Sequence, residues 1–273
     1  MADRLKALAK RWVSEVALRA ASASQERLLL YHRVEARPRS SDPWSLARTD
    51  FEAQLAEIGR LGYDVVDLMQ LVGPVPPRAG RRVAIAFDDG YASTLENALP
   101  ALRRAGYVAT FFLVPGAMGA TSTWEAPLGL AASEVMSWSD ARRLADSDMA
   151  IGSHSFSHAD LSRATDAEMR REIRLARDLV VERLGIQVNA FSVPFGRDDA
   201  RLDRELRASG HRVKVTNELA RRIRTDDFAV EPCTAIINGD DLREFRKKLS
   251  GAYDWLRTYR RMRRRVARRP REG

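Results

Sequence analysis

Two short polar runs contain the residue types that metal-dependent hydrolysis requires. The run FDDG places Asp88 and Asp89 directly after the apolar segment 83–87, and the run HSFSH places His154 and His158 directly after a second apolar segment. Two imidazoles and one carboxylate can hold a catalytic zinc and leave a fourth position open to water. The remaining carboxylate can then accept a proton. The pattern therefore predicts a site in which one aspartate binds a metal and the other acts as a base.

Each run also has an explanation that involves no chemistry. An Asp pair before glycine is common in turns that cap the following helix, and two nearby histidines in a loop commonly form surface hydrogen bonds. Helical zinc proteases share this histidine spacing, but they carry glutamate directly after the first histidine, where this chain has Ser155. A strand-like run also precedes His154, so protease chemistry is disfavoured.

Strand-like and helix-like segments alternate along most of the chain. Apolar runs typical of strands lie at residues 27–34, 63–68, 83–87, 107–114, 149–154, 188–193, 211–216 and 228–237. Two of the intervening helices are expected to begin at capping boxes, Thr49 with Glu52 and Thr165 with Glu168. This alternation predicts an α/β fold, and the number of units favours a closed or nearly closed (β/α) barrel over two domains. Catalytic residues in such barrels lie where strands end, as both polar runs do.

The composition is that of an ordinary soluble protein. The 273 residues are 45% hydrophobic and 30% charged, and the single cysteine, Cys233, excludes an internal disulfide. Charge interrupts every apolar run near the N-terminus before a signal-peptide core could form, so cytoplasmic residence is expected.

The net charge of +9 is concentrated at the C-terminus. Residues 257–273 contain nine arginines and one glutamate, and an apolar stripe at helical spacing runs from Leu242 to Val266. A weaker basic amphipathic pattern covers the N-terminus. Such helices suggest peripheral contact with an anionic membrane at its inner face, and the alternative is a packed last helix followed by a solvated basic end. No nucleic-acid partner is expected, because no recognition module accompanies the tail.

Together the motifs resemble those of the polysaccharide deacetylases of the NodB-homology type, also called carbohydrate esterase family four. The family's Thr-Phe-Asp-Asp-Gly motif corresponds to AFDDG, and its His-Ser/Thr-x-x-His motif corresponds to HSFSH. The resemblance covers roughly residues 28–250 and implies a distorted (β/α) barrel there, between an amphipathic helix over residues 1–27 and a basic helix or tail over residues 251–273. It also implies that Asp88 is the general base and that Asp89, His154 and His158 bind the metal.

The third family motif, Arg-x-Pro-Phe/Tyr, corresponds to the run FSVPFG, where Ser192 occupies the position of the arginine that orients the base. Pro194 and Phe195 match the family's substrate-binding residues. The resemblance implies that Phe195 supplies a backbone N–H to the oxyanion and a ring wall for the acetyl methyl. A core aromatic at a strand end is the alternative. Cys233 also lies where relatives often carry arginine.

The general acid is expected near the N-terminus. Common family members carry it on a C-terminal Leu-x-His motif, and the corresponding run PCTAIINGDD has no histidine. The run LLLYHRV resembles the opening strand of the biofilm poly-N-acetylglucosamine deacetylases, which implies that His32 is the acid, with an imidazole pKa near the working range. A buried structural histidine is the alternative for His32, and His211, at the start of its strand, is interpreted as structural.

The resemblance implies hydrolysis of N-acetyl groups on an amino-sugar-containing glycan or glycolipid, in the synthesis of an exopolysaccharide or cell-surface polysaccharide. Zn²⁺ is the expected metal, and Co²⁺, Ni²⁺ or Mn²⁺ also suit mixed nitrogen and oxygen ligands. Three alternatives stay open: another amide or ester bond, such as a formyl or acetyl group on a lipid-linked sugar; a catalytically silent carbohydrate-binding or membrane-associated module; and binding of nucleic acid by the tail. Trp124 and Trp138 are candidates for stacking on sugars or for packing the long loop near residues 115–135.

Overall fold

The structure, a computed structural model, describes residues 26–74, 80–217 and 221–254. Its strands are β1 (Glu26–Tyr31), β2 (Arg33–Glu35), β3 (Ser45–Ala47), β4 (Tyr63–Val65), β5 (Arg81–Phe87), β6 (Thr110–Leu113), β7 (Ala150–Ser153), β8 (Ala190–Ser192), β9 (Val213–Thr216), β10 (Ile223–Arg224) and β11 (Ala229–Ala235). Its helices are α2 (Arg48–Arg60), α3 (Leu68–Val72), α4 (Ala92–Ala105), α5 (Trp138–Ala145), α6 (Asp166–Leu184), α7 (Ala200–Ala208) and α8 (Leu242–Ser250), with short 3₁₀ turns at Pro115–Ala117, Ala126–Leu128 and Pro194–Gly196.

Seven parallel strands close into a barrel, which confirms the predicted fold class. The hydrogen-bonded order is β1, β11, β9, β8, β7, β6 and β5, and β1 also pairs with β5 to complete the ring. Tyr31 lies opposite Phe87, and Leu28 lies opposite Cys233, so β1 bridges an early strand and the last one. The short strands β4 and β10 extend the sheet at β5 and β11.

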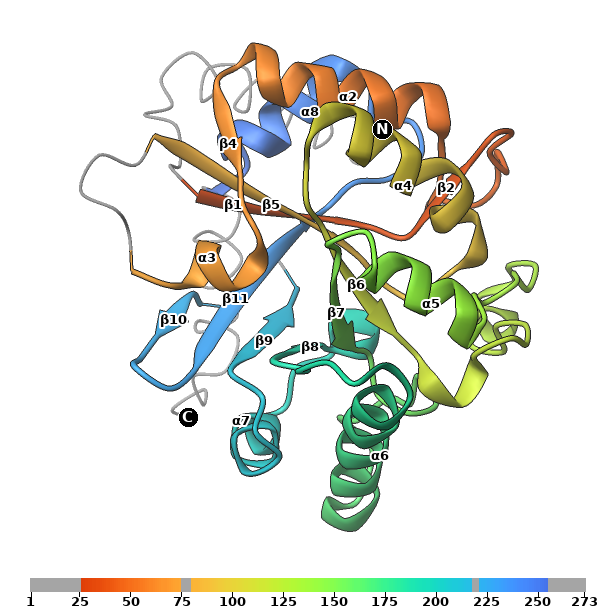
Figure 1. The fold of residues 1–273 in the computed structure, drawn as a ribbon, viewed down its shortest axis with the longest axis vertical. Coiled ribbons are helices and arrows are strands. Elements are labelled where there is room, and N and C mark those ends of the chain that lie inside the picture. Colours follow the sequence, from red (N-terminus) through yellow and green to blue (C-terminus); the bar gives the residue numbers. More distant parts are fainter. Residues whose placement is uncertain (1–25, 75–79, 218–220, 255–273) are drawn as a thin grey trace, which may run out of the picture.

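Alternating side chains divide the barrel into an inner and an outer core. Along β5, Ala84 and Ala86 face inward, whereas Val83, Ile85 and Phe87 pack outward against the helices. Phe112 fills the barrel interior, and a Cβ at Gly152 would lie 2.5 Å from its ring carbons, so this position requires glycine. Helices surround the barrel in Figure 1, with α2, α4 and α8 on one side and α6 and α7 on the opposite side.

Two sequence-based expectations about helix ends are wrong. The helix α2 has Ala47 as its N-cap and no side-chain cap, because β3 runs directly into it and places Thr49 inside the first turn. The second predicted capping box is confirmed, since Thr165 caps α6 together with Glu168. The helix α8 ends at Ser250, where Gly251 adopts a left-handed φ of 78°, so one helix does not carry the apolar stripe from Leu242 to Val266.

The predicted terminal segments lie largely outside the described residues. The strand β1 begins at Glu26, two residues before the predicted barrel boundary, and the predicted helix upstream of it falls within residues 1–25. Most of the predicted basic tail falls within residues 255–273. Across the described ranges, none of the helices has the length and apolar character needed to cross a bilayer.

Candidate active site

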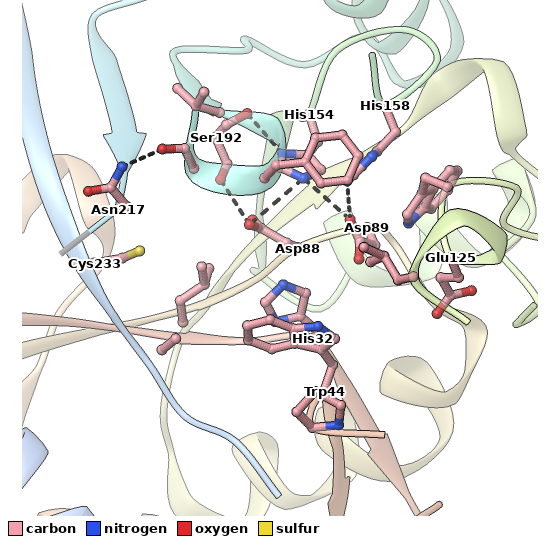
Figure 2. A pocket seen from close by; sticks show the side chains of 18 of the residues that line it. His32, Trp44, Asp88, Asp89, Glu125, His154, His158, Ser192, Asn217 and Cys233 are labelled. Atoms are coloured by element: carbon pink, nitrogen blue, oxygen red, sulfur yellow. Dashed lines mark hydrogen bonds and ion pairs between the residues drawn. The ribbon is translucent and has the colours of Figure 1, made fainter. Parts of the chain in front are cut away.

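A cavity of about 650 Å³ lies at the carboxyl ends of the barrel strands. It brings together six of the seven site residues predicted from the sequence: His32, Asp88, Asp89, His154, His158 and Phe195. Figure 2 shows His32 across the cavity from the two histidines of the HSFSH run, with the aspartates between them. The seventh residue, Pro194, is buried and does not line the cavity. Side chains distant in sequence therefore share one site because their strands end at the same edge of the barrel.

Asp89, His154 and His158 form a candidate metal centre. Asp89 Oδ1 lies 3.3 Å from His154 Nε2 and 3.1 Å from His158 Nε2. The three potential ligand atoms all lie within 4.8 Å of one another, and the three residues are buried. Two imidazole nitrogens and a carboxylate oxygen, with open space beside them in the cavity, are the donors that a catalytic zinc-type ion uses. The residues therefore fit a divalent metal.

The backbone around these ligands is constrained. Asp89 and His158 adopt positive φ values of 73° and 59°, a region that costs energy for residues other than glycine. Gly90 follows with φ of 65°, and a Cβ there would lie 3.1 Å from a methyl carbon of Leu113. The FDDG turn thus needs its glycine in order to place Asp89 at the end of β5.

Hydrogen bonding fixes which nitrogen His154 presents to the centre. His154 Nδ1 lies 2.8 Å from the backbone oxygen of Ser192. Because a carbonyl oxygen can only accept, Nδ1 carries the hydrogen and the Nε2 lone pair of the neutral ring faces Asp89. Partners of this kind orient a metal-binding imidazole.

Charges at the centre favour an added cation. Burial acts to raise the pKa of Asp89, but the imidazoles of His158 and His154 hold it well below its usual value, so Asp89 is an anion. Burial acts to lower the pKa of His154, but the carboxylates of Asp88 and Asp89 raise it to about 9. Burial lowers the pKa of His158. Two neighbouring carboxylates thus attract positive charge, which a divalent cation can supply in place of a proton.

Ser192 donates the hydrogen bond that orients Asp88. Its hydroxyl lies 3.0 Å from Asp88 Oδ2, and Asp88 Oδ1 accepts no hydrogen bond from any described residue. Burial raises the pKa of Asp88 to about 6 against the lowering effect of His154; the Asp89 carboxylate raises it further and the Ser192 hydroxyl lowers it. A carboxyl group with a pKa in this range suits general base catalysis near neutral pH. The serine therefore takes over the contact that the family's arginine was expected to make.

Removing this hydroxyl should lower turnover. Hydrogen bonds to charged groups contribute about 1.5–3 kcal/mol, so Ser192→Ala should reduce kcat by about 10- to 150-fold. Bound metal should be retained, because the backbone oxygen that orients His154 survives the change. Steady-state hydrolysis kinetics and metal analysis test both expectations. Ser192→Thr, which keeps the hydroxyl, is the matched control, and an equal loss in both variants would contradict the role of the hydroxyl.

His32 lies on the other side of the cavity, against a tryptophan. Its imidazole packs on Trp44 with ring centroids 4.3 Å apart and an interplanar angle of 35°. Burial lowers the pKa of His32 to about 4, although the Asp89 carboxylate acts in the opposite direction. The sequence-based expectation of a pKa near the working range is therefore wrong for the isolated site, because the barrel end removes the imidazole from water.

Aromatic rings enclose His158. The Trp124 indole stacks on its imidazole at 4.6 Å with an interplanar angle of 16°, and the Phe195 ring meets it edge-on at 4.6 Å and 82°. Phe195 is 40% exposed with a positive φ of 57°, so it is a rim residue rather than a core aromatic. Trp138 begins α5 and packs on the outer core, away from the residues that line the cavity.

Sequence reasoning missed several residues around the site. Trp44, Tyr91 and Glu125 line the cavity, and buried Arg33 contacts Glu125. No motif marks Trp44 or Glu125, because they reach the site through loops whose path the strand pattern does not define. Tyr91 directly follows the FDDG run and Arg33 directly follows His32, so their positions in the sequence were a signal that could have indicated them. His211 lies outside the cavity, where its imidazole contacts the hydroxyl groups of Ser153 and Ser209, in agreement with a structural role.

The fold is a closed parallel barrel, and paired aspartates and histidines form a candidate metal centre at the carboxyl ends of its strands. This combination places the protein in the class of barrel hydrolases. Within that class, the chain belongs to the polysaccharide deacetylase family, whose sequence pattern matches residues 76–214.

Individual relatives are distant. YxkH of Bacillus subtilis, whose name assigns it to the polysaccharide deacetylases, is 23% identical over 196 residues, which are 70% of this chain and 64% of that protein. The deacetylase PplD of Streptococcus pyogenes, solved in complex with acetate, has a TM-score of 0.67 and 16% identity, over 82% of this chain and 97% of that one. IcaB from Ammonifex degensii has a TM-score of 0.64 and 21% identity over 82% and 97%. The chain thus spans about 64% of the length of its curated relative, and the solved structures confirm the fold.

Proposed function

We propose that the protein is a metal-dependent hydrolase that removes N-acetyl groups from an amino-sugar-containing glycan or glycolipid. The observation that carries this proposal is the convergence of Asp89, His154 and His158 within 4.8 Å of one another, next to Asp88 in the strand-end cavity. A ligand triad beside a separate carboxylate base is the arrangement that metal-assisted amide hydrolysis requires.

The metal would be held by Asp89 and by Nε2 of both histidines. Zn²⁺ suits two imidazoles, one carboxylate and an open position best, while Co²⁺, Ni²⁺ and Mn²⁺ accept the same donors. When bound, the ion would make water more acidic and polarise the acetyl carbonyl.

The remaining chemistry falls to side chains of the cavity. Asp88, oriented by Ser192, takes the proton of the attacking water through its open Oδ1. Phe195 lies beside the centre, where its ring can contact the acetyl methyl and its backbone N–H can donate to the oxyanion, and Pro194 fixes the turn that carries it. The products are acetate and a free amino sugar.

His32 is assigned as the proton donor to the leaving nitrogen. Its lowered pKa, about 4, leaves the imidazole neutral in the resting cavity. Negative charge that develops on the substrate opposes this shift, since a nearby anion stabilises imidazolium. As the reaction proceeds, His32 therefore takes up the proton that Asp88 has removed from water, and it passes this proton to the leaving nitrogen. One proton thus moves from water to the amine, and both side chains return to their resting states.

An acetylated polysaccharide is the substrate class that family membership implies, and the N-acetyl amide is our proposal within it. The acetate found with PplD supports a deacetylation product in a barrel of this fold. A complete set of four acidic and imidazole side chains supports an active enzyme rather than a silent module. A lipid-linked sugar, or a formyl group in place of acetyl, fits the same chemistry.

Product analysis on a panel of substrates tests the proposal. Metal-reconstituted protein should release acetate from at least one N-acetylated glycan or lipid-linked amino sugar, and excess chelator should abolish release until metal is restored. Formate in place of acetate would identify the formyl alternative. Stoichiometric metal without release from any member of the panel would support the silent module and overturn the proposal.

Cytoplasmic residence and peripheral contact with anionic lipid form a separate part of the proposal. They rest on the basic terminal segments, which carry most of the net charge of +9. A surface-bound enzyme of this kind would meet lipid-linked sugars at the inner face of the membrane.

A further inference from the structure

Arg33 directly follows His32 and has no part in the chemistry above, yet it is 1% exposed and both of its terminal nitrogens are hydrogen-bonded. Its Nη2 donates to Asp42 Oδ2, and its Nη1 donates to Glu125 Oε1 and to the hydroxyl of Ser133. Its guanidinium carbon also lies 4.6 Å from the centroid of the Tyr91 ring, two residues after Asp89. One guanidinium therefore joins three segments that surround the cavity.

The first carboxylate partner belongs to the loop that covers His32. Asp42 Oδ1 accepts the backbone N–H of Trp44 at 2.9 Å, and its other oxygen accepts from Arg33. The Trp44 ring in turn packs on His32 at 4.3 Å. A continuous series of contacts thus runs from Arg33 through Asp42 and Trp44 to His32, and we name it the acid branch.

The second carboxylate partner belongs to the loop that covers His158. Glu125 follows Trp124 in sequence and accepts from Arg33 and from the Tyr91 hydroxyl, the latter at 3.1 Å. Trp124 Nε1 donates to the same Tyr91 hydroxyl at 3.3 Å. Because the Trp124 ring stacks on His158, this series runs from Arg33 to a metal-ligand candidate, and we name it the ligand branch.

We propose that Arg33 is a positioning residue that aligns His32 and His158 by holding their two covering tryptophan loops at a fixed separation. The inference rests on the proposed function, since it assumes that His32 and His158 act in catalysis and metal binding. The acid branch sets the orientation of the proton donor, and the ligand branch sets the orientation of the imidazole that faces Asp89.

The chemistry of this contact specifically requires arginine. A planar guanidinium offers donors in fixed directions, so two carboxylates on different loops are held at a defined separation; a lysine ammonium lacks this fork. Asp42 and Glu125 are both buried, at 2% exposed, so their charges depend on Arg33 for compensation. A purely structural ion pair would not need to bridge two loops that each place an indole on a site imidazole.

Each branch can be weakened separately. Asp42→Asn and Glu125→Gln keep the side-chain shape and leave Arg33 paired with the other carboxylate, so neither variant leaves the guanidinium without an anion. Two readouts distinguish them: metal affinity, measured by competition with a chromogenic chelator, and kcat, measured on an N-acetyl amide and on an aryl acetate whose leaving group needs no proton.

The two variants should fail differently. Glu125→Gln should weaken metal affinity by about 10- to 100-fold, the usual effect of losing a partner that orients a ligand, and should regain amide turnover at saturating metal. Asp42→Asn should bind metal within about twofold of the unaltered protein and lose about 10- to 100-fold in amide kcat, with aryl acetate turnover retained. Similar losses in both readouts for both variants, or no loss in either, would overturn the inference.

Arg33→Lys should combine the two defects, and Arg82→Lys is its matched control. Arg82 is also buried, at 5% exposed, and pairs with Glu26 at the opposite end of the barrel. Thermal unfolding of both variants corrects for lost stability, and Arg82→Lys should keep metal affinity and turnover per folded molecule. If the unaltered protein neither binds metal nor releases acetate, the proposed function fails; if it does both and the Arg33 and Arg82 variants behave alike, only this inference fails.

Discussion

Replacing Asp88 with asparagine should lower the kcat of acetate release by about 10²- to 10⁴-fold, the range that general base catalysis contributes. The amide keeps the shape of the carboxyl group and can still bond to the Ser192 hydroxyl, but it cannot take a proton from water. Asp88 is not among the three residues whose ligand atoms converge, so bound metal should remain stoichiometric. Steady-state kinetics and elemental analysis of the same sample provide the two measurements.

A variant at His32 is the informative comparison. His32→Gln should also retain metal, yet it should keep most of its activity on an aryl acetate, because that leaving group departs without protonation. The Asp88 variant should lose activity on both substrates, since water must be activated in either case. Full turnover in the Asp88→Asn protein would contradict its assignment as the base.

Removing one of the candidate metal-binding side chains should have the second large effect on activity. His154→Ala or Asp89→Ala should eliminate stoichiometric metal binding and reduce acetate release to background. Each change leaves two of the three converging donors, and the Asp89 change also removes the anion that stabilises positive charge there. Metal content after dialysis and activity after metal titration are the measurements.

The chelator experiment supplies the control for these variants. Unaltered protein stripped of metal should regain activity when Zn²⁺ or Co²⁺ is restored, whereas neither variant should respond at any metal concentration. His211→Ala is the matched control, because it removes a histidine side chain that lies outside the cavity. This variant should bind metal as the unaltered protein does. Metal bound by the His154 variant with unchanged affinity would show that the ion lies elsewhere.

The barrel and the residues of the candidate metal centre were predictable because each polar motif directly follows a predicted strand. Asp88 follows β5 and His154 follows β7, so knowing that parallel strands end at one edge was enough to bring them together. The resemblance to a family added His32, which the structure places across the same cavity. The pattern of apolar residues indicates where each strand lies and ends, because inward and outward side chains alternate along each strand and both are buried in the barrel.

The loops around the site could not be predicted in the same way. Ser192 reads as a departure from a motif, and only its position 3.0 Å from Asp88 reveals a hydrogen bond that serves the base. Arg33 lies 92 positions from Glu125, and no periodic pattern relates them. The failed capping box at Thr49 has a similar origin, since pairing of β3 with β2 determines where α2 begins. Tertiary contacts, rather than a local sequence pattern, decided all three.

The barrel closes through β1, the strand that precedes His32. Complete pairing of β1 therefore depends on β11, which is synthesised much later. Leu28 pairs with Cys233 on one side and with Ala84 on the other, so β1 can occupy its place fully only after β11 has emerged from the ribosome. Pairings this remote in sequence form slowly. Closure of the ring is therefore expected late in assembly. The pairing of β1 with β5 does not depend on β11, so it can bring His32 next to Asp88 before the barrel closes.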